Sequence, residues 1–156
     1  MDKQSPQTKL ENSERKFPRV GIGVMIENKK GEILLGLRQG SHGAGEWSFP
    51  GGHLEWGETI FETARREVKE ETGLDVYKFE LISVFDELRY LESEGKHYLG
   101  IGVKAVYNGG DPKVMEEEKF KEWDWFAVDQ LPKRLFEGTE IMLKNFKEGK
   151  IYQNYV

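Results

Sequence analysis

Apolar and polar positions alternate along several short segments, and this pattern predicts strands. Residues 19–38 alternate and contain many β-branched side chains, so they predict two strands joined by a short turn at Lys29–Gly31. The segments 75–88 and 97–108 follow the same pattern, and the polar stretch 89–96 separates them. The intervening segment 39–57 is rich in glycine and is expected to be mostly loop.

Two segments predict helices. Residues 58–72 contain many helix formers and neither glycine nor proline, and Gly73 follows where a left-handed cap is expected. Residues 139–149 predict a closing helix. Strands on both sides of a central helix, with another helix at the end, indicate an α/β (α+β) sandwich built on a mixed sheet.

The chain of 156 residues is expected to form one domain over 19–156. Residues 1–18 are polar and charged, which predicts a flexible N-terminal arm. This arm has no apolar segment typical of a signal peptide, and no apolar stretch approaches the roughly 20 residues of a membrane span. We therefore expect a cytoplasmic protein without a membrane partner.

The amino-acid composition excludes some kinds of site and argues against some kinds of partner. Zero cysteines exclude disulfides and thiolate zinc sites, and the three histidines lack a zinc-ligand spacing. A net charge of −5 without a basic block argues against a nucleic-acid polymer as partner. An acidic protein can still act on a polyphosphate when divalent cations bridge its carboxylates to the substrate.

The central helix gathers carboxylates beside its apolar side. At 100° per residue, one apolar stripe is formed by Ile60, Phe61, Ala64 and Val68, and the solvated face carries Glu62, Arg65, Arg66 and Lys69. Three more glutamates, at 67, 70 and 71, are spaced i, i+3 and i, i+4 and border the stripe. Repulsion and desolvation disfavour this arrangement unless a hard cation such as Mg²⁺ or Mn²⁺ is present. The alternative is a surface helix whose glutamates pair with its own basic residues.

The residues around these glutamates follow the pattern G-x5-E-x7-R-E-U-x-E-E-x-G-U, where U is apolar. It begins at Gly52, continues through Glu58, and ends at Leu74. This pattern resembles the signature of the Nudix (MutT-like) hydrolases. Similarity to nucleoside triphosphate pyrophosphatases extends over about 19–132, including the segment PGGHLEWGE at 50–58. The resemblance implies a Nudix-type α/β/α sandwich with a central catalytic helix and a C-terminal helix.

The resemblance also implies roles for individual residues. Glu67, Glu70, Glu71 and the Gly51 carbonyl would bind Mg²⁺, with Mn²⁺ as the alternative, and the ion would activate a water molecule. The proton acceptor would be Glu67 or a glutamate of the later loop, where Glu118 is preferred to Glu117.

Further residues would support this reaction. Arg66 would orient Glu70, with Glu58 in a similar supporting role. The substrate would be bound by Arg38 and His53, by the loop backbone at Gly52, which a Cβ would obstruct, and by Trp47 in a stacking wall. Other aromatic candidates for this wall are Phe49, Trp123, Trp125 and Phe136.

The substrate implied by the resemblance is a nucleoside triphosphate, standard or oxidised, cleaved to nucleoside monophosphate and pyrophosphate. Dinucleoside polyphosphates and nucleotide sugars are the alternatives, and Tyr90 lies about where dinucleoside polyphosphate hydrolases have a tyrosine. The segment SQPWPFPxS of NADH pyrophosphatases is absent, as is the proline near position 90 of many ADP-ribose enzymes. A nucleotide-binding regulatory domain without catalysis is an alternative of another class.

We also predict a homodimer. The resemblance to the family and the aromatic-rich segment 123–136, which exceeds what one small core buries, both favour it. Light scattering at micromolar concentration should give twice the chain mass of 18.1 kDa. A monomer mass would contradict this expectation.

Overall fold

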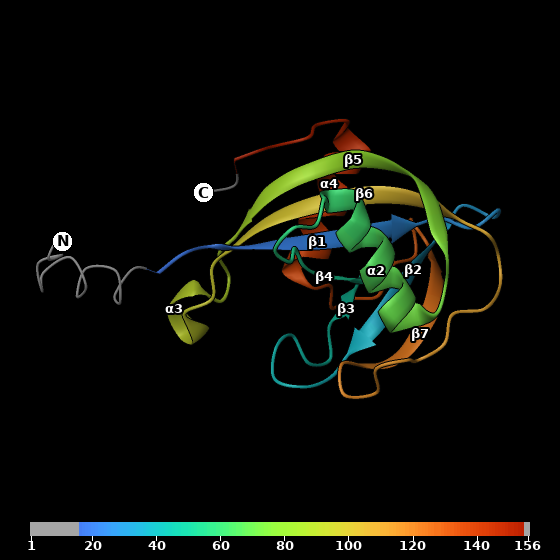
Figure 1. Ribbon diagram of the computed structural model, residues 1–156, viewed down its shortest axis with the longest axis horizontal. Coiled ribbons are helices and arrows are strands. Elements are labelled where there is room, and N and C mark those ends of the chain that lie inside the picture. The colour runs from blue at the N-terminus through green and yellow to red at the C-terminus, as the bar shows by residue number, and fades with distance from the viewer. Residues whose placement is uncertain (1–15, 155–156) are drawn as a thin grey trace, which may run out of the picture.

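The computed structural model describes residues 16–154, and Figure 1 shows its two sheets and its helices. Most of the expected N-terminal arm, residues 1–15, lies outside the described residues. Residues 16–18 are exposed and belong to no helix or strand. Among the described residues, no helix is both long enough and apolar enough to cross a membrane.

The larger sheet has four strands in the order β4 (Gly51–His53), β1 (Arg19–Ile26), β6 (Tyr98–Tyr107) and β5 (Val76–Glu87). Strands β1 and β6 are parallel, whereas β1–β4 and β5–β6 are antiparallel. The predicted mixed sheet is therefore confirmed.

The smaller sheet is antiparallel, in the order β3 (Trp47–Ser48), β2 (Glu32–Arg38) and β7 (Phe120–Ala127). The two strands expected within 19–38 both form, but β1 and β2 belong to different sheets. Strands β3 and β4 lie in the stretch that the sequence predicted as mostly loop, where glycines at 51 and 52 conceal any alternation of side chains.

Helix α2 (Ile60–Thr72) packs against β4, β1 and β5, and α4 (Glu137–Glu148) packs against β5 and β3. A third short helix, α3 (Leu91–Glu94), lies in the polar stretch between β5 and β6. Figure 1 shows α2 and α4 on opposite sides of the larger sheet, as the predicted sandwich requires.

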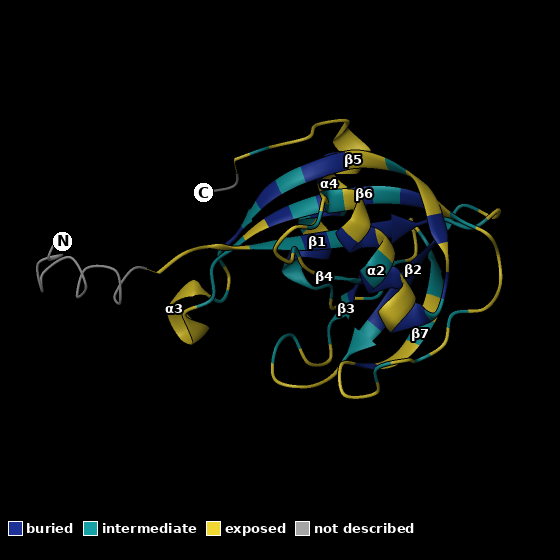
Figure 2. Ribbon diagram, viewed as in Figure 1, coloured by how far each residue is buried: buried dark blue, intermediate teal, exposed yellow. Residues whose placement is uncertain are grey.

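Alternation along the strands produces two apolar clusters. Val24 and Ile26 of β1 join Ala64 and Val68 of α2 in the first cluster. Met25, between them in sequence, points the other way and joins the second cluster with Met142 of α4. Buried positions thus lie on both sides of β1, between the two helices (Figure 2).

The predicted apolar stripe of α2 needs one correction. Ala64 and Val68 are fully buried, but Phe61 is 40% exposed. Phe61 lies at the edge of the stripe, and its ring stacks on Phe79 of β5 with 5.2 Å between centroids. The middle of the buried side is occupied instead by Glu71, which is 2% exposed.

Local interactions fix both ends of α2. Thr59 is the N-cap: its hydroxyl accepts the Glu62 N–H, while the Glu62 carboxylate accepts the Thr59 N–H. The helix therefore begins two residues after the predicted Glu58. Gly73 ends it at φ 76°, the left-handed conformation that glycine adopts without strain.

We predict that Thr59→Ala lowers the free energy of unfolding by about 1 kcal/mol, because the Glu62 N–H loses its side-chain acceptor. Thr59→Ser retains a hydroxyl and serves as the matched control. Urea denaturation of the two variants checks this, and equal losses would show that the hydroxyl has no capping role.

Candidate functional site

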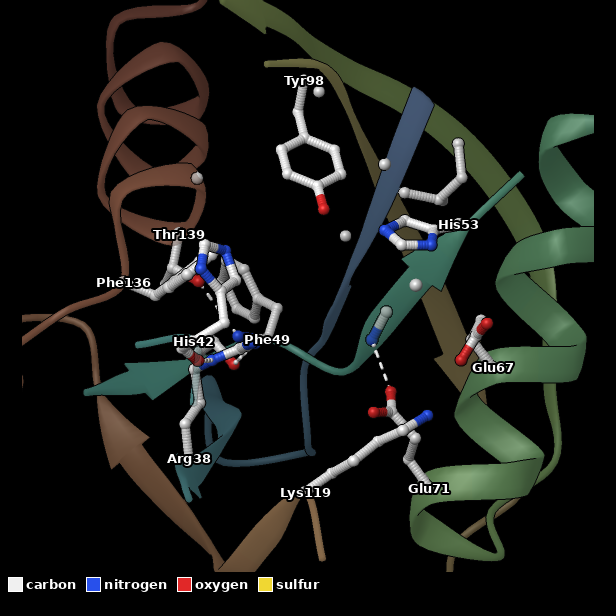
Figure 3. A pocket seen from close by; sticks show the side chains of 18 of the residues that line it. Arg38, His42, Phe49, His53, Glu67, Glu71, Tyr98, Lys119, Phe136 and Thr139 are labelled. Atoms are coloured by element: carbon white, nitrogen blue, oxygen red, sulfur yellow. Dashed lines mark hydrogen bonds between the residues drawn. The ribbon is translucent and has the colours of Figure 1, made fainter. Parts of the chain in front are cut away.

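A cavity of about 730 Å³ lies between α2 and the start of α4, with β1, β4 and β6 along its floor. Figure 3 shows Glu67 and Glu71 on one side, Phe136 and Thr139 on the other, and Arg38 and His42 also near the α4 side. The cavity brings together most of the residues expected to form the site. They are Arg38, Gly51, Gly52, His53, Arg66, Glu67, Glu70, Glu71 and Glu118.

Glu67 and Glu71 carry buried carboxyl groups that face this cavity. Their exposed fractions are 6% and 2%, and desolvation raises the pKa of Glu67 and raises that of Glu71 well above its ordinary value. The Gly51 N–H donates to Glu71 Oε1 at 2.7 Å, whereas Glu67 Oε2 is buried without a partner among the described residues. The carboxyl oxygens of Glu67 and Glu71 therefore have only part of the hydrogen bonds that they could accept from the described residues.

Arg66 holds the acidic cluster in place. It donates to the two oxygens of Glu58 at 2.6 and 2.9 Å, to Glu67 at 2.8 Å and to Glu70 at 3.3 Å. The hydrogen bonds from Arg66 lower the pKa of Glu58 to about 2. Arg66 was expected on the solvated face. It is partly buried instead, because the loop before α2 folds back over it and supplies Glu58.

Gly51 and Gly52 let the backbone of β4 approach α2. A Cβ on Gly52 would lie 2.2 Å from the Glu67 carboxylate, and one on Gly51 would lie 2.0 Å from the Ile22 carbonyl oxygen. Both contacts are far shorter than any side chain tolerates. This close approach places the Gly51 N–H on Glu71, so both positions require glycine for the packing of β4 itself.

The donor set fits a hard divalent cation in chemistry, though the carboxylates do not surround one position. Glu67 and Glu71 offer buried oxygens, one of them unpartnered, and hard cations prefer carboxylate oxygen. The Glu70 carboxylate is about half exposed and pairs with Arg66. Within residues 16–154, no three acidic or imidazole side chains are grouped to hold an ion as they stand.

Two further cationic side chains line the cavity, Arg38 near α4 and Lys119 near α2. The Arg38 guanidinium lies 4.2 Å from the centroid of the Phe136 ring, and burial lowers its pKa. It donates to the His42 carbonyl and to Ser48 Oγ. Lys119 lies beside Glu71 (Figure 3), and its positive charge partly offsets the rise in the pKa values of Glu67 and Glu71. No pattern in the sequence distinguishes Lys119, which lies in an ordinary run of charged residues.

The remaining expected residues lie in different places. Glu118 is exposed and lines the cavity, and the His53 ring stacks on Tyr98 with 5.4 Å between centroids. Trp47 does not line the cavity: its ring packs edge-on against Phe126, 4.9 Å away, at the second apolar cluster. Strand β3 is only two residues long, and Ser48 rather than Trp47 takes the side that faces the cavity.

Two of the other aromatic candidates, Phe49 and Phe136, do line the cavity, whereas Trp123 and Trp125 pack against the first apolar cluster.

Near the start of α4 lies a carboxyl group that the sequence patterns did not indicate. Glu87, the last residue of β5, is 8% exposed, and desolvation raises its pKa to about 7. The sequence shows only one acid among many at that position, and no spacing sets it apart.

The chain is similar to a known domain family and to several known proteins. Residues 17–146 match the NUDIX domain family. The NAD-capped RNA hydrolase NudC of Pectobacterium atrosepticum is 28% identical over 88% of this chain and 54% of its own length. The chain thus spans about half the length of this relative.

Two further similarities cover more of the related protein. The oxidized purine nucleoside triphosphate hydrolase of Danio rerio is 34% identical over 71% of this chain and 68% of its own length. The crystal structure of a MutT NUDIX hydrolase from Burkholderia pseudomallei superposes with a TM-score of 0.77 and 34% identity. It covers 83% of this chain and 98% of that one.

The raised pKa of Glu87 predicts a pH-dependent difference between the wild type and Glu87→Gln. The folded pKa of about 7 exceeds the ordinary 4.5, so stability from the protonated carboxyl is complete below pH 4.5 and is lost as pH rises through 7. The uncharged amide lacks this loss. The unfolding free energy of Glu87→Gln should therefore gain about 2 to 3 kcal/mol on the wild type between pH 4.5 and pH 8.

Urea denaturation across this pH range measures the difference. The other carboxyl groups are common to both proteins and cancel. Glu80→Gln, an exposed position on the same strand, is the matched control and should follow the wild type. Parallel pH profiles for wild type and Glu87→Gln would contradict the prediction.

Proposed function

The chain belongs to the NUDIX domain family, and we propose that it is a metal-dependent pyrophosphohydrolase that cleaves a nucleoside triphosphate to nucleoside monophosphate and pyrophosphate. The observation that carries this proposal is the pair of buried carboxyl groups at Glu67 and Glu71, facing a cavity large enough for a nucleotide. One of their oxygens has no partner among the described residues. The similarity to a hydrolase of oxidized purine nucleoside triphosphates supports this substrate class.

Glu67 and Glu71 would hold Mg²⁺ or Mn²⁺, with the Gly51 carbonyl and Glu70 as further ligands. A bound ion of this kind supplies an acidified water molecule and offsets negative charge on phosphate oxygens. Arg66 keeps Glu67 oriented while Glu58 holds Arg66, so the carboxylates are positioned before substrate arrives.

We assign the role of proton acceptor to Glu118. Glu67 is the alternative, but its carboxylate accepts a hydrogen bond from Arg66 and would also bind the ion. Glu118 lines the cavity, and its carboxylate makes no hydrogen bond or ion pair with another described residue. A carboxylate that is free to move can approach the attacking water and accept its proton.

The phosphate chain would lie between the two ends of the cavity. Arg38 and Lys119 are the cationic side chains on this path, and a guanidinium can bind two phosphate oxygens at once. His53 lines the same region, where its ring, held against Tyr98, can contact a phosphate. These residues bind and orient the substrate, and the homodimer expected above remains a prediction.

We predict that hydrolysis requires Mg²⁺ or Mn²⁺ and stops in excess EDTA after bound metal has been removed. Glu71→Gln keeps the side-chain shape and removes a ligand charge, so kcat should fall by several orders of magnitude. Glu80→Gln is the matched control and should keep wild-type turnover. Release of pyrophosphate and nucleoside monophosphate from pooled nucleoside triphosphates measures both effects, and full turnover in EDTA would refute the mechanism.

Cleavage at the β-phosphorus is the second expectation from this proposal. Hydrolysis in ¹⁸O-labelled water should place the label in pyrophosphate and none in the monophosphate, because the water oxygen bonds to the β-phosphorus and the monophosphate leaves. Mass spectrometry of the two products checks this. Label in the monophosphate would mean attack at the α-phosphorus, and release of orthophosphate with a diphosphate would mean cleavage of the terminal linkage.

A further inference from the structure

Glu87 presents an unusual group at the end of the cavity near α4. The residue is only 8% exposed and lines the cavity, and no hydrogen bond or ion pair joins its carboxyl group to another described residue. Because Glu87 lines the cavity, a ligand bound there can supply the hydrogen-bond donors that the described residues do not.

The charged neighbours of Glu87 are engaged elsewhere. Those that influence it electrostatically are Glu137, Arg38, Arg89 and Glu46. Arg38 donates to the His42 carbonyl and to Ser48, and Arg89 pairs with Glu140 at 3.0 Å. Among the described residues, neither arginine donates a hydrogen bond to Glu87. The carboxyl therefore lies within reach of positive charge without being neutralised by it.

The surroundings of Glu87 suit a flat ring. Gly100 and Gly23 have no side chain, so the Phe85 ring and the Met142 thioether lie directly against the strands and form an apolar floor. The Phe136 ring lines the same end of the cavity, edge-on to the His42 ring at 5.4 Å. Aromatic and apolar walls of this kind bind heterocycles by stacking and burial.

Gly138 sets how closely α4 packs on the Glu87 carboxyl group. The space bordered by Phe85, Met142 and Phe136 is called the slot below. A Cβ at Gly138 would be only 3.1 Å from Glu87 Oε2 and 3.1 Å from the Phe85 ring. The first turn of α4 thus packs tightly on both side chains. This packing restricts the Glu87 carboxyl group to one position at the edge of the slot.

We propose that Glu87 selects the base of the substrate by accepting two hydrogen bonds, one from a ring N–H and one from the exocyclic amino group beside it, the edge that guanine presents at N1 and its 2-amino group. An ionised carboxylate offers two acceptor oxygens side by side and no donor. Two N–H donors favour the ionised form, as do the charges of Arg38 and Arg89. Adenine offers one donor beside an acceptor on the corresponding edge, and hypoxanthine lacks the second donor. This inference rests on the proposed function for the direction in which the nucleotide lies.

The test measures binding of nucleoside monophosphates by calorimetry in EDTA, which requires neither metal nor turnover. Wild-type protein should bind GMP at least about tenfold more tightly than IMP, because IMP lacks the 2-amino donor to a charged acceptor. In Glu87→Gln the amide offers one acceptor and one donor, which suits the lactam edge of IMP. The ratio should fall to about one or below.

Glu80→Gln, exposed on the same strand, is the matched control and should keep the wild-type ratio. The comparison of GMP with IMP on wild-type protein needs no variant, so it holds whatever happens to the folding of Glu87→Gln. Equal affinity for GMP and IMP in the wild type, or a preference that Glu87→Gln leaves unchanged, overturns the proposal.

Turnover of triphosphates is assayed separately in Mg²⁺. Absent turnover with a GMP preference that depends on Glu87 would reject the proposed hydrolysis and support the base-selection role. Turnover with a GMP-to-IMP ratio that does not depend on Glu87 would reject base selection alone.

Discussion

The site depends on the burial of two carboxyl groups on the core-facing side of α2. Glu71 takes the middle of the stripe that packs against β4, beside the fully buried Ala64 and Val68. Burying a carboxylate is costly, and the chain offsets this with the Gly51 N–H on Glu71 and the Arg66 guanidinium on Glu67. The offset is incomplete because one oxygen of Glu67 stays unpartnered among the described residues. In the proposed function, a bound cation would offset this remaining cost.

Arg66 fixes the positions of the groups that surround these buried carboxyl groups. Its bonds to both oxygens of Glu58 tie the loop before α2 to the helix, and its bond to the His53 carbonyl ties β4 to the same group. Exposed ion pairs contribute little to stability, but a partly buried, bidentate guanidinium within a network holds its partners in place. The register of β4 against β1 then sets Gly51 and Gly52 opposite the two buried acids. The glycines and the acidic residues of the motif therefore depend on the same packing of β4 against α2.

The sequence was sufficient for features that depend on local spacing. Period-2 alternation predicted β1, β2, β5 and β6, and the capping glycine fixed the end of α2 at Thr72. The spacing of the motif gathered Glu58, Arg66, Glu67 and Glu71. Contacts that depend on strand register were beyond it. Glu87 reaches the cavity because it ends β5 opposite Tyr98, and Trp47 misses it because a two-residue strand presents Ser48 instead. Neither fact leaves a trace in the spacing of residues along the chain.

In the proposed binding mode, the two acidic ends of the cavity would act on different parts of a nucleotide. Glu67 and Glu71 would face the phosphates, where two carboxylates without a cation would repel a polyanion and Lys119 alone would not balance them. Glu87 faces the slot of aromatic and apolar side chains, where a base carries no charge and an acidic acceptor meets only N–H donors. Arg38 lies between these ends and is influenced by both Glu71 and Glu87. An acidic cavity can therefore bind an acidic ligand when cations serve one end and hydrogen-bond donors the other.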